Sequence, residues 1–554
     1  MMDQTIKNPI LPGFYPDPSI CRVGNDFYMI TSSFMLFPGV PIFHSTDLAT
    51  WNQIGNVLDR PSQLHLIGQP LVGGIMAPTI RYHDGVFYII NTNFSSKGNF
   101  IVTAEEPQGP WSEPIWLPDV TGIDPSLFFD EDGSCYVCGT RQQVQADGTQ
   151  GPQVIWMAEF DLDAMKLKSS PVDIWGGALV NAPYPEAPHL YKKDGWYYLI
   201  IAEGGTEHFH AVTVARSRAL NVWFDGYKGN PILTHRHLGK NYPIGNAGHA
   251  DLVETVTGEW YAVLLASRLI GGYHKNLGRE TYLVPVDWED GWPVLSPGTG
   301  KIEWTYPAPA LPPTPRIERP ARVDFDQPEL DQEFIFFGTP YQDFWRIHNG
   351  WLTMKLLPQH LSPEQKKIQP GPSQPDPTIP SLAFIGKRQT DVNFQVATRL
   401  KFTAEKSYEA AGLAIVQASN HQLRLERTVE SGKQILRLVQ VTCDARGMPF
   451  HPDFTSKTHV ETLVAAECPW EDVVLVIRQN VQAIDFLFGP DEQSLRLLAG
   501  QVDGRVINPE KVGGMIGTCL GMFATANGEK SDNIAGFDWF EYRRPDERIR
   551  GDKK

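Results

Sequence analysis

The sequence has little cysteine, little positive charge and few apolar runs, and each shortage excludes a class of protein. Six cysteines in 554 residues are too few for a disulfide-stabilised scaffold and suit a reducing compartment. Asp and Glu outnumber Lys and Arg by 64 to 48, a formal net charge of −16, so we expect no nucleic acid and no membrane surface as a partner. No run of about 18 apolar residues could cross a bilayer.

The start of the chain bears on the location of the protein, and its one C-x-x-C pair bears on whether it has a metal or redox site. Residues 1–9 lack the basic and apolar regions of a signal peptide, so we predict a cytoplasmic location. Cys135 and Cys138 fall in a predicted strand, where positions three apart face opposite sides, and no second pair accompanies them. We therefore expect neither a metal site nor a redox centre at these cysteines.

A proline-rich stretch divides the chain into two parts. Prolines recur between Tyr306 and Arg322, where they lack amide donors and favour extended backbone, which indicates a linker over 307–322. We predict one domain over 5–306 and a second over 323–545. Short β-branched and aromatic segments in the second part indicate a β-sandwich: Leu413–Gln417, Ile435–Val441, Val473–Arg478 and Gly536–Tyr542. The stretch Leu357–Ser381, rich in Pro and Gln, is predicted to be a surface loop.

The first part contains a motif of turn residues followed by an aromatic residue or Cys, and then Tyr and an apolar run. The five copies are Gly24–Tyr28, Asp84–Tyr88, Asp132–Tyr136, Asp194–Tyr198 and Thr257–Tyr261. Each copy predicts a hairpin turn followed by a strand, and a period of roughly 60 residues leaves room for about four strands. Five such units indicate five blades of a β-propeller, and the alternative is a chance recurrence of such turns in an ordinary β-protein.

Counting back from each repeat tyrosine by twelve residues, or eleven in the first copy, reaches five residues of which four are polar. They are Asp17, Met76, Asp124, Glu186 and His249. Equivalent positions of propeller blades lie at similar radii, so if these residues begin the innermost strands, their side chains point to the central axis. The sequence thus predicts three carboxylates and an imidazole at the mouth of one channel.

Three neighbouring carboxylates suit acid–base chemistry. The charge of two raises the pKa of the third, which supplies a protonated acid beside an ionised base. Glycoside hydrolysis needs such a pair, and carboxylates spread around an axis favour the inverting route, which leaves about 6.5–9.5 Å for a water. A structural calcium site or a ring of salt bridges are the alternatives. The pattern alone does not assign the base between Asp17 and Asp124.

The chain resembles glycoside hydrolase family 43, in particular its β-xylosidase and α-L-arabinofuranosidase members. The residues that carry the resemblance, over essentially the whole chain, are Asn8–Ser19, Gly122–Phe128, Glu186–Tyr191 and Gly248–Glu254. It implies an all-β protein, a five-bladed β-propeller followed by a concanavalin-like β-sandwich. It also implies that Asp17 is the general base, Glu186 the general acid, and Asp124 the residue that tunes the pKa of Glu186 and orients the sugar.

The same resemblance implies roles for four further residues. His249 would lie under the active centre and hold the carboxylates through water or a structural calcium, and its alternative is a hydrogen-bonded core residue. Arg279 would reach sugar hydroxyls or form an ordinary salt bridge. Phe34 would wall the sugar pocket or pack in the core. Met76 stands where similar enzymes often have Trp, which puts the shape of the pocket in doubt.

We therefore expect an inverting exo-glycosidase that needs no cofactor and releases terminal arabinofuranose or xylose from hemicellulose oligosaccharides. An endo-arabinanase on the same propeller and a non-catalytic carbohydrate-binding protein are the alternatives. A closed central pocket would favour the exo-enzyme and an open groove the arabinanase. The sequence does not rank xylose against arabinose, and similar proteins are commonly dimers or tetramers, so a homo-oligomer is allowed.

Overall fold

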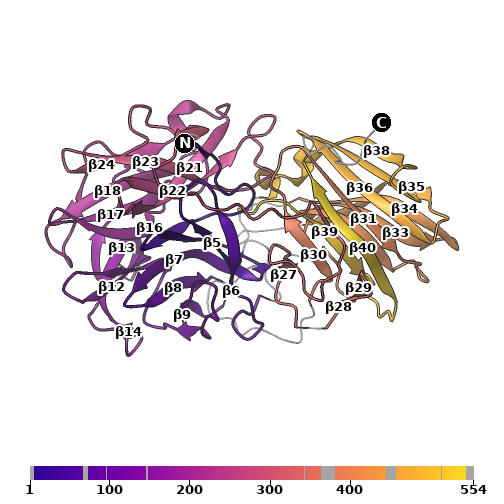
Figure 1. The fold of residues 1–554 in the computed structure, drawn as a ribbon, viewed down its shortest axis with the longest axis horizontal. Helices are drawn as coiled ribbons and strands as arrows, with labels where there is room; N and C mark the ends of the chain where they lie inside the picture. The colour runs from indigo at the N-terminus through magenta and orange to yellow at the C-terminus, as the bar shows by residue number, and fades with distance from the viewer. Residues whose placement is uncertain are drawn as a thin grey trace.

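The computed structural model describes residues 5–66, 73–94, 96–144, 148–341, 343–362, 381–444, 457–512 and 515–544. Two lobes built almost entirely from strands lie side by side, the first holding the N-terminal part of the chain and the second the C-terminal part (Figure 1). Helical turns are confined to η1 (Arg236–Leu238), η2 (Gly504–Ile507) and α1 (Pro509–Val512) among the described residues. None of the helices in this part of the chain is long and apolar enough to span a membrane.

The first lobe contains five antiparallel sheets of four or five strands, taken in chain order. The first sheet is β2 (Ser19–Val23), β3 (Asp26–Ile30), β5 (Gly39–Ser45) and β6 (Asn52–Leu58), and the second is β7 (Ile75–His83), β8 (Val86–Asn93), β9 (Gly98–Ala104) and β10 (Ile115–Trp116). The third is β11 (Ile123–Phe129), β12 (Cys135–Val144), β13 (Gln150–Asp161), β14 (Lys166–Leu167) and β15 (Val172–Trp175). The fourth is β16 (Glu186–Lys193), β17 (Trp196–Glu203), β18 (Ala211–Ser217), β19 (Asp225–Gly226) and β20 (Leu233–Thr234), and the fifth is β21 (Ile244–Glu254), β22 (Trp260–Arg268), β23 (Glu280–Glu289) and β24 (Trp292–Leu295).

Each sheet begins with the predicted hairpin. All five turn motifs lie between the first and second strands of a sheet, and each is followed by a strand that carries the repeat tyrosine, as predicted. The first strand of each sheet contacts the first strand of the next, and β21 contacts β2. The five first strands therefore form a closed ring, which brings residues far apart in the sequence together at its centre.

The two ends of the first lobe are joined to each other. Strand β1 (Thr5–Lys7) pairs with β25 (Thr305–Pro307), which follows the fifth sheet. The side-chain amide of Asn8 donates hydrogen bonds to the carbonyl oxygens of Leu283 and Glu303 at 2.9 and 3.0 Å. These bonds hold the N-terminal segment, which leads into the first sheet, against the fifth sheet and the segment that follows it. The first lobe is thereby closed without a covalent bond.

The second lobe contains two larger sheets. One follows the order β28-β29-β40-β31-β36-β37-β38, with β26 added to β40, and the other the order β30-β39-β32-β33-β34-β35. Their strands are β26 (Arg322–Val323), β28 (Trp345–His348), β29 (Trp351–Lys355), β30 (Phe384–Arg388), β31 (Phe394–Lys401), β32 (Ala410–Ala418), β33 (His421–Glu430), β34 (Lys433–Cys443), β35 (Thr458–Glu467), β36 (Asp472–Asn480), β37 (Ala483–Gly489), β38 (Arg496–Asp503), β39 (Cys519–Thr525) and β40 (Ile534–Arg543). All four predicted sandwich segments lie in strands, whereas most of the predicted Pro- and Gln-rich loop lies outside the described residues.

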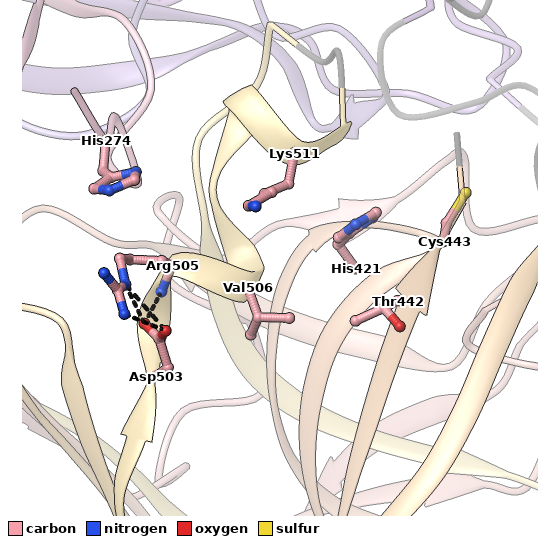
Figure 2. Close-up of a pocket in the computed structure, with 8 residues that line it drawn as sticks. All are labelled: His274, His421, Thr442, Cys443, Asp503, Arg505, Val506 and Lys511. Atoms are coloured by element: carbon pink, nitrogen blue, oxygen red, sulfur yellow. Dashed lines mark hydrogen bonds and ion pairs between the residues drawn. The ribbon is translucent and has the colours of Figure 1, made fainter. Parts of the chain in front are cut away.

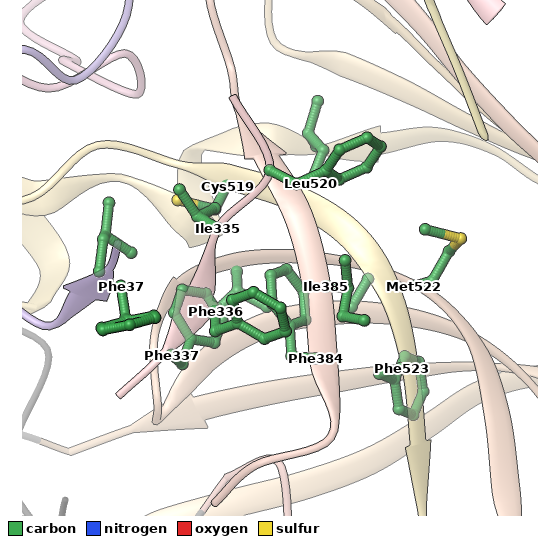
Figure 3. Packing of buried hydrophobic residues seen from close by; sticks show 14 of the residues in the cluster. Phe37, Ile335, Phe336, Phe337, Phe384, Ile385, Cys519, Leu520, Met522 and Phe523 are labelled. Carbon is green, nitrogen blue, oxygen red and sulfur yellow. The ribbon is translucent and has the colours of Figure 1, made fainter. Parts of the chain in front are cut away.

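The two lobes share one apolar core rather than a solvated hinge. Strand β27 (Phe336–Phe337) pairs with β4 (Leu36–Phe37) of the first lobe. Phe337 stacks on Phe384 with ring centroids 4.2 Å apart, and Phe37 lies beside Phe336 (Figure 3). Buried residues of both lobes belong to the same hydrophobic cluster. Because burial of each large apolar side chain contributes about 1.5–3 kcal/mol, this contact holds the lobes in one relative position.

The predicted linker is extended but packed. The Thr314 hydroxyl accepts a hydrogen bond of 2.7 Å from the Thr46 amide, and the Thr314 amide donates to Asp47 at 2.8 Å. Cys135 and Cys138 are buried in different hydrophobic clusters, as positions that face opposite sides of one strand should be. No disulfide joins any cysteines in the described ranges.

Candidate active site

In or just before each of the five first strands stands a residue other than glycine that has a positive φ angle. These residues are Asp17 (54°), Ala77 (39°), Asp124 (54°), Ala187 (54°) and His249 (53°). Such angles are uncommon outside glycine, and they persist where the surrounding structure fixes them, often at functional sites. The repetition shows that one backbone conformation recurs in all five sheets at the end of the ring where the polar residues gather.

This recurrence corrects the predicted register in two sheets. Asp17, Asp124 and His249 occupy equivalent positions, but Met76 and Glu186 stand one residue before the equivalents, which are Ala77 and Ala187. The cause is turn length. Two-residue turns close the hairpins of the first, second and fourth sheets, whereas three-residue turns add one residue in the third and fifth. A uniform count of twelve therefore overshoots where the turn is short.

Glu186 nevertheless belongs to the same cluster as the two aspartates. The charges of Asp124 and Asp17 both act on its carboxyl, and Arg279 acts on all three carboxyls. The main-chain bend at Ala187 follows Glu186 directly, and a register shift separates Glu186 from His189 in the pairing with β17. The structure thus brings the three predicted carboxylates together from β11, β16 and the segment before β2.

Asp17 is surrounded by donors that stabilise its charged form. The residue is 4% exposed, and its carboxylate accepts hydrogen bonds from Arg279 Nη1 at 2.7 Å and from the Ser32 hydroxyl at 2.6 Å. The His249 Nδ1 atom lies 3.5 Å from Asp17 Oδ1. Burial alone would raise the pKa of Asp17, but Arg279, His249 and Ser32 outweigh it and hold this pKa below its ordinary value. Asp17 is therefore ionised at neutral pH.

Asp124 and Glu186 have the opposite environment. Burial, followed by the negative charge of Asp17, raises the pKa of Asp124 to about 7. Part of the Glu186 side chain is open to solvent, yet loss of solvation is the largest cause that raises its pKa well above the ordinary value, and the charge of Asp124 is the next. A hydrogen bond with Gln153 acts in the other direction. The pair therefore retains a proton near neutral pH, within reach of an ionised carboxylate.

Arg279 joins the carboxylates to the second lobe. This residue is 5% exposed. Its Nε donates to the carbonyl oxygen of Met515 at 3.3 Å, and its guanidinium lies over the Phe34 ring, 5.4 Å from the centroid. Its Nη2 is buried and has no hydrogen-bond partner among the described residues. A buried donor without a partner costs about 1–3 kcal/mol, so this atom is available to a polar ligand beside Asp17.

The two remaining predicted pocket residues both contact the hydrophobic core that the lobes share. Phe34 is 1% exposed and packs against Phe14 with centroids 5.5 Å apart, so its contacts are those of a core residue beneath Arg279. Met76 is partly buried and packs against the core shared by the lobes. Its carbonyl oxygen accepts a hydrogen bond from Asn91 at 3.2 Å.

A buried network beneath the carboxylates was not predicted. Asp251, two residues after His249, is fully buried and accepts hydrogen bonds from the Ser19 hydroxyl at 2.7 Å, the Tyr191 hydroxyl at 2.5 Å and Arg81 Nη1 at 2.9 Å. These partners come from β2, β16 and β7, so one carboxylate ties four of the five first strands together. The sequence contained a signal for this network. Ser19 and Asp251 stand two positions after the residues with positive φ in their own sheets, and Arg81 and Tyr191 stand four positions after theirs. Side chains two or four positions apart in a strand face the same side.

His210 is a second residue that the sequence reasoning missed. It is buried, and its Nδ1 donates to the carbonyl oxygen of Asn246 at 3.0 Å. A Cβ at Gly248 would lie 2.5 Å from the His210 ring, so the close approach of this ring to the residue before His249 requires glycine. Burial lowers the pKa of His210 to about 3, and the ring is neutral. It therefore acts as a support rather than a charge.

Two exposed aromatic residues lie in the segments that precede Glu186 and follow β17, the strand that pairs with β16. Tyr184, two residues before Glu186, is 51% exposed, and Phe209, next to His210, is 64% exposed. The segments that carry them are joined by a hydrogen bond of 2.9 Å from the Gly204 amide to the Pro183 carbonyl oxygen. Exposed rings of this kind offer flat faces for stacking.

No cluster of three or more His, Cys, Asp or Glu side chains that could hold a metal is found within the described ranges. Calcium takes about six to eight oxygen ligands. Around His249, the near carboxylate is that of Asp17, which already binds Arg279. The side chains beneath the site therefore do not form a calcium cage by themselves.

The whole chain is similar to enzymes of known class. The model of a family described as "Glycosyl hydrolases family 43" matches residues 6–293, and one described as "Beta xylosidase C-terminal Concanavalin A-like domain" matches residues 322–543. A xylosidase/arabinosidase of Butyrivibrio fibrisolvens is 42% identical, over 96% of this chain and 98% of its own length. A non-reducing end alpha-L-arabinofuranosidase of Bacteroides ovatus is 34% identical, over 98% and 96%.

A solved structure is similar over the same span. The crystal structure of xylan beta-1,4-xylosidase from Bacillus halodurans has a TM-score of 0.86 and 32% identity, and the match covers 97% of this chain and 100% of that one. The likeness therefore includes both lobes and their arrangement.

Proposed function

We propose that this chain, which belongs to glycosyl hydrolase family 43 and is therefore a glycoside hydrolase, releases terminal α-L-arabinofuranose and β-D-xylose units from hemicellulose oligosaccharides with inversion. The observation that supports this proposal best is the opposite tuning of neighbouring carboxyls, with Asp17 held ionised and the Asp124–Glu186 pair holding a proton. One ionised base and one protonated acid are what inverting hydrolysis needs.

In the proposed reaction, Asp17 accepts a proton from a water molecule that attacks the anomeric carbon. Glu186 donates its proton to the glycosidic oxygen as the bond to the leaving sugar breaks. Asp124 keeps the pKa of Glu186 high, and the unpaired Nη2 of Arg279 donates to a sugar hydroxyl. No step uses a metal, and a structural calcium under His249 would have to be held largely through water.

The fold we propose for the first lobe is a five-bladed β-propeller, with each of the five sheets as one blade. The closed ring of first strands supports this arrangement, since propeller blades meet along their innermost strands. We also propose domain boundaries at 5–306 and 323–545 with the linker 307–322 between them, because β25 and β26 lie on either side of the linker.

The exposed rings of Tyr184 and Phe209 support an oligosaccharide substrate. The acid stands on the side of the leaving group, and Tyr184 precedes it by two residues in a segment that is hydrogen-bonded to the segment of Phe209. A leaving sugar can stack on such rings, whereas the terminal sugar would lie against the three carboxyls and the unpaired Nη2 of Arg279.

The substrate proposal is tested by assaying the nitrophenyl α-L-arabinofuranoside and β-D-xyloside side by side. We expect release of nitrophenol from both compounds and no cleavage in the interior of a debranched arabinan chain. Internal cleavage of that chain would favour an endo-arabinanase.

The Asp124→Asn variant should shift the pH dependence of activity. Glu186 must be protonated, so activity of the native enzyme falls as the pH rises through the pKa of the carboxyl pair. Removing the charge of Asp124 lowers the pKa of Glu186, and we expect the alkaline limb of kcat/KM to move to lower pH by about one pH unit. The acid limb of kcat/KM, which is set by the pKa of Asp17, should remain at low pH.

The control for this variant is Asp130→Asn at the opposite end of β11, where the carboxylate binds Lys192 and Tyr197. Its pH profile should match that of the native enzyme. An alkaline limb that stays in place or moves to higher pH in Asp124→Asn would show that Asp124 does not tune the acid.

The second lobe should be required for activity, because it positions Arg279. A Cβ at Gly517 would lie 2.3 Å from the carbonyl oxygen of Leu277, so Gly517→Ala must push the segment holding Met515 away from the segment holding Arg279. We expect kcat/KM to fall roughly tenfold to a hundredfold, since about 1 Å of misplacement can cost this much. Steady-state kinetics and the thermal midpoint are measured together.

Gly55→Ala is the matched control, since its added Cβ meets atoms at ordinary distances of 3.8 and 3.9 Å. It should retain native kinetics. Full activity in a folded Gly517→Ala protein would show that the second lobe does not position Arg279 for catalysis.

A further inference from the structure

A cavity of about 490 Å³ lies apart from the carboxylate cluster, at the junction of the two lobes. His274 comes from the segment between β22 and β23 of the first lobe, and the other lining residues come from the second lobe (Figure 2). They are His421, Thr442, Cys443, Asp503, Arg505, Val506 and Lys511. Its volume lies within the range of about 300–1,000 Å³ that is typical of small-molecule sites.

The charge of this cavity is opposite to that of the protein. The guanidinium of Arg505 binds both carboxylate oxygens of Asp503, with two contacts of 2.8 Å, so these two charges cancel. The ammonium of Lys511 has no acceptor among the described residues, and it points into the space between the Asp503–Arg505 pair and His421 (Figure 2). A single positive charge thus faces the cavity in a chain of net charge −16, which favours an anion.

Two histidines of the cavity add one hydrogen-bond donor, on His274, and one acceptor, on His421, to the ammonium of Lys511. Asn508 Oδ1 accepts from the Glu510 amide, so Asn508 Nδ2 donates to His274 Nδ1 at 2.7 Å and the proton of the His274 ring is on Nε2. Burial, with the charge of Lys511, lowers the pKa of His421 to about 4. Its Nδ1 donates to Asn420 Oδ1 at 3.2 Å, which leaves Nε2 as an acceptor.

The ligand that fits this set has a carboxylate and hydroxyl groups. Lys511 and His274 can donate to a carboxylate, and His421 can accept from a hydroxyl. No aromatic ring other than the histidines lines the cavity among the described residues, so polar contacts rather than stacking select the ligand. We propose that the cavity is a second ligand site, distinct from the catalytic one, which binds a hexuronic acid either free or as a unit of an oligosaccharide.

Two of the segments that line this cavity, those of His274 and of Arg505–Lys511, lead to the residues that place Arg279. Asn276, between His274 and Arg279, donates to the Gly504 carbonyl oxygen at 3.0 Å and accepts from the Thr518 amide at 2.9 Å. Lys275 binds Glu510 at 2.9 Å. A ligand that joins His274 to Lys511 therefore holds together the two segments whose contact at Met515 fixes Arg279.

The test is isothermal titration of the full-length protein with D-glucuronate, in the presence of excess D-xylose to occupy the catalytic site. We expect saturable binding at one site, no binding of D-glucose, and affinity at least about tenfold lower in Lys511→Gln, because a charge-assisted hydrogen bond is lost. Lys228→Gln, at an exposed lysine of the first lobe, removes the same charge elsewhere and should bind like the native protein. Equal thermal midpoints without ligand show that both variants fold.

A pentose oligosaccharide with one glucuronic acid unit distinguishes the two sources of the ligand. Tighter binding than that of free glucuronate identifies the acidic unit of a substrate, and equal binding identifies the free acid. The proposal is overturned if glucuronate does not bind, if D-glucose binds equally well, or if Lys511→Gln binds as the native protein does. None of these results depends on hydrolysis, so they leave the proposed activity untouched.

Discussion

Asp17→Asn should lower kcat about 10²–10⁴-fold on every substrate, whatever its leaving group. The base acts on water, and removal of its charge leaves no other ionised carboxylate beside the attacking molecule. Asparagine has the same shape. Its Oδ1 can still accept from Arg279 and its Nδ2 can donate to the Ser32 hydroxyl, the two groups that donate to Asp17 at 2.7 and 2.6 Å. This matters because an alanine would leave the buried Arg279 charge without a partner and destabilise the protein.

Steady-state kinetics on an aryl pentoside and on a natural oligosaccharide measure the effect, with the thermal midpoint as the test of folding. Asp130→Asn changes a buried aspartate that follows β11, at the end of this strand opposite to Asp124. This variant should keep kcat within about twofold. If folded Asp17→Asn retains a tenth or more of the native kcat, Asp17 is not the base.

Glu186→Gln should separate substrates by their leaving groups. A natural sugar alkoxide needs a proton as it departs, so we expect kcat/KM on oligosaccharides to fall about 10²–10⁴-fold. A nitrophenolate leaves without protonation, and the loss on nitrophenyl pentosides should be smaller by at least about tenfold. The neutral glutamine can still bond with Gln153, which contacts the carboxyl in the native protein, so the fold should be kept.

The comparison of two substrates within one variant makes this result independent of enzyme concentration. Asp17→Asn serves as the control, because it should lose activity equally on both. A loss of the same size on both substrates in Glu186→Gln would mean that Glu186 is not the acid.

The fold was readable from the sequence where local chemistry repeats. Turn residues before each repeat tyrosine, such as Asp84-Gly85 and Asp194-Gly195, specify hairpins with little help from the rest of the chain. The register of the first strands was not readable from counting, because a three-residue turn and a two-residue turn look alike in such motifs. Proline was the better marker, since Pro18 and Pro78 each follow the residue with positive φ.

The site was predictable to the extent that its residues stand at strand ends. Asp17, Asp124 and Glu186 could be placed together before any contact was known. The buried partners could not, because Asp251 and Arg81 look like ordinary strand residues until the ring closes and brings β21 beside β2 and β7. The contact of Met515 with Arg279 was equally hidden, since it depends on how two lobes pack.

Single displacement by water is tested most directly by proton NMR of the first product released from a β-D-xyloside, recorded before mutarotation. If Asp17 activates water on the face opposite to the group that Glu186 protonates, the anomeric configuration inverts and no covalent sugar–enzyme intermediate forms. The expected first product is α-xylose, which later equilibrates with the β form. Initial release of β-xylose would contradict the mechanism and make Asp17 or Asp124 a nucleophile.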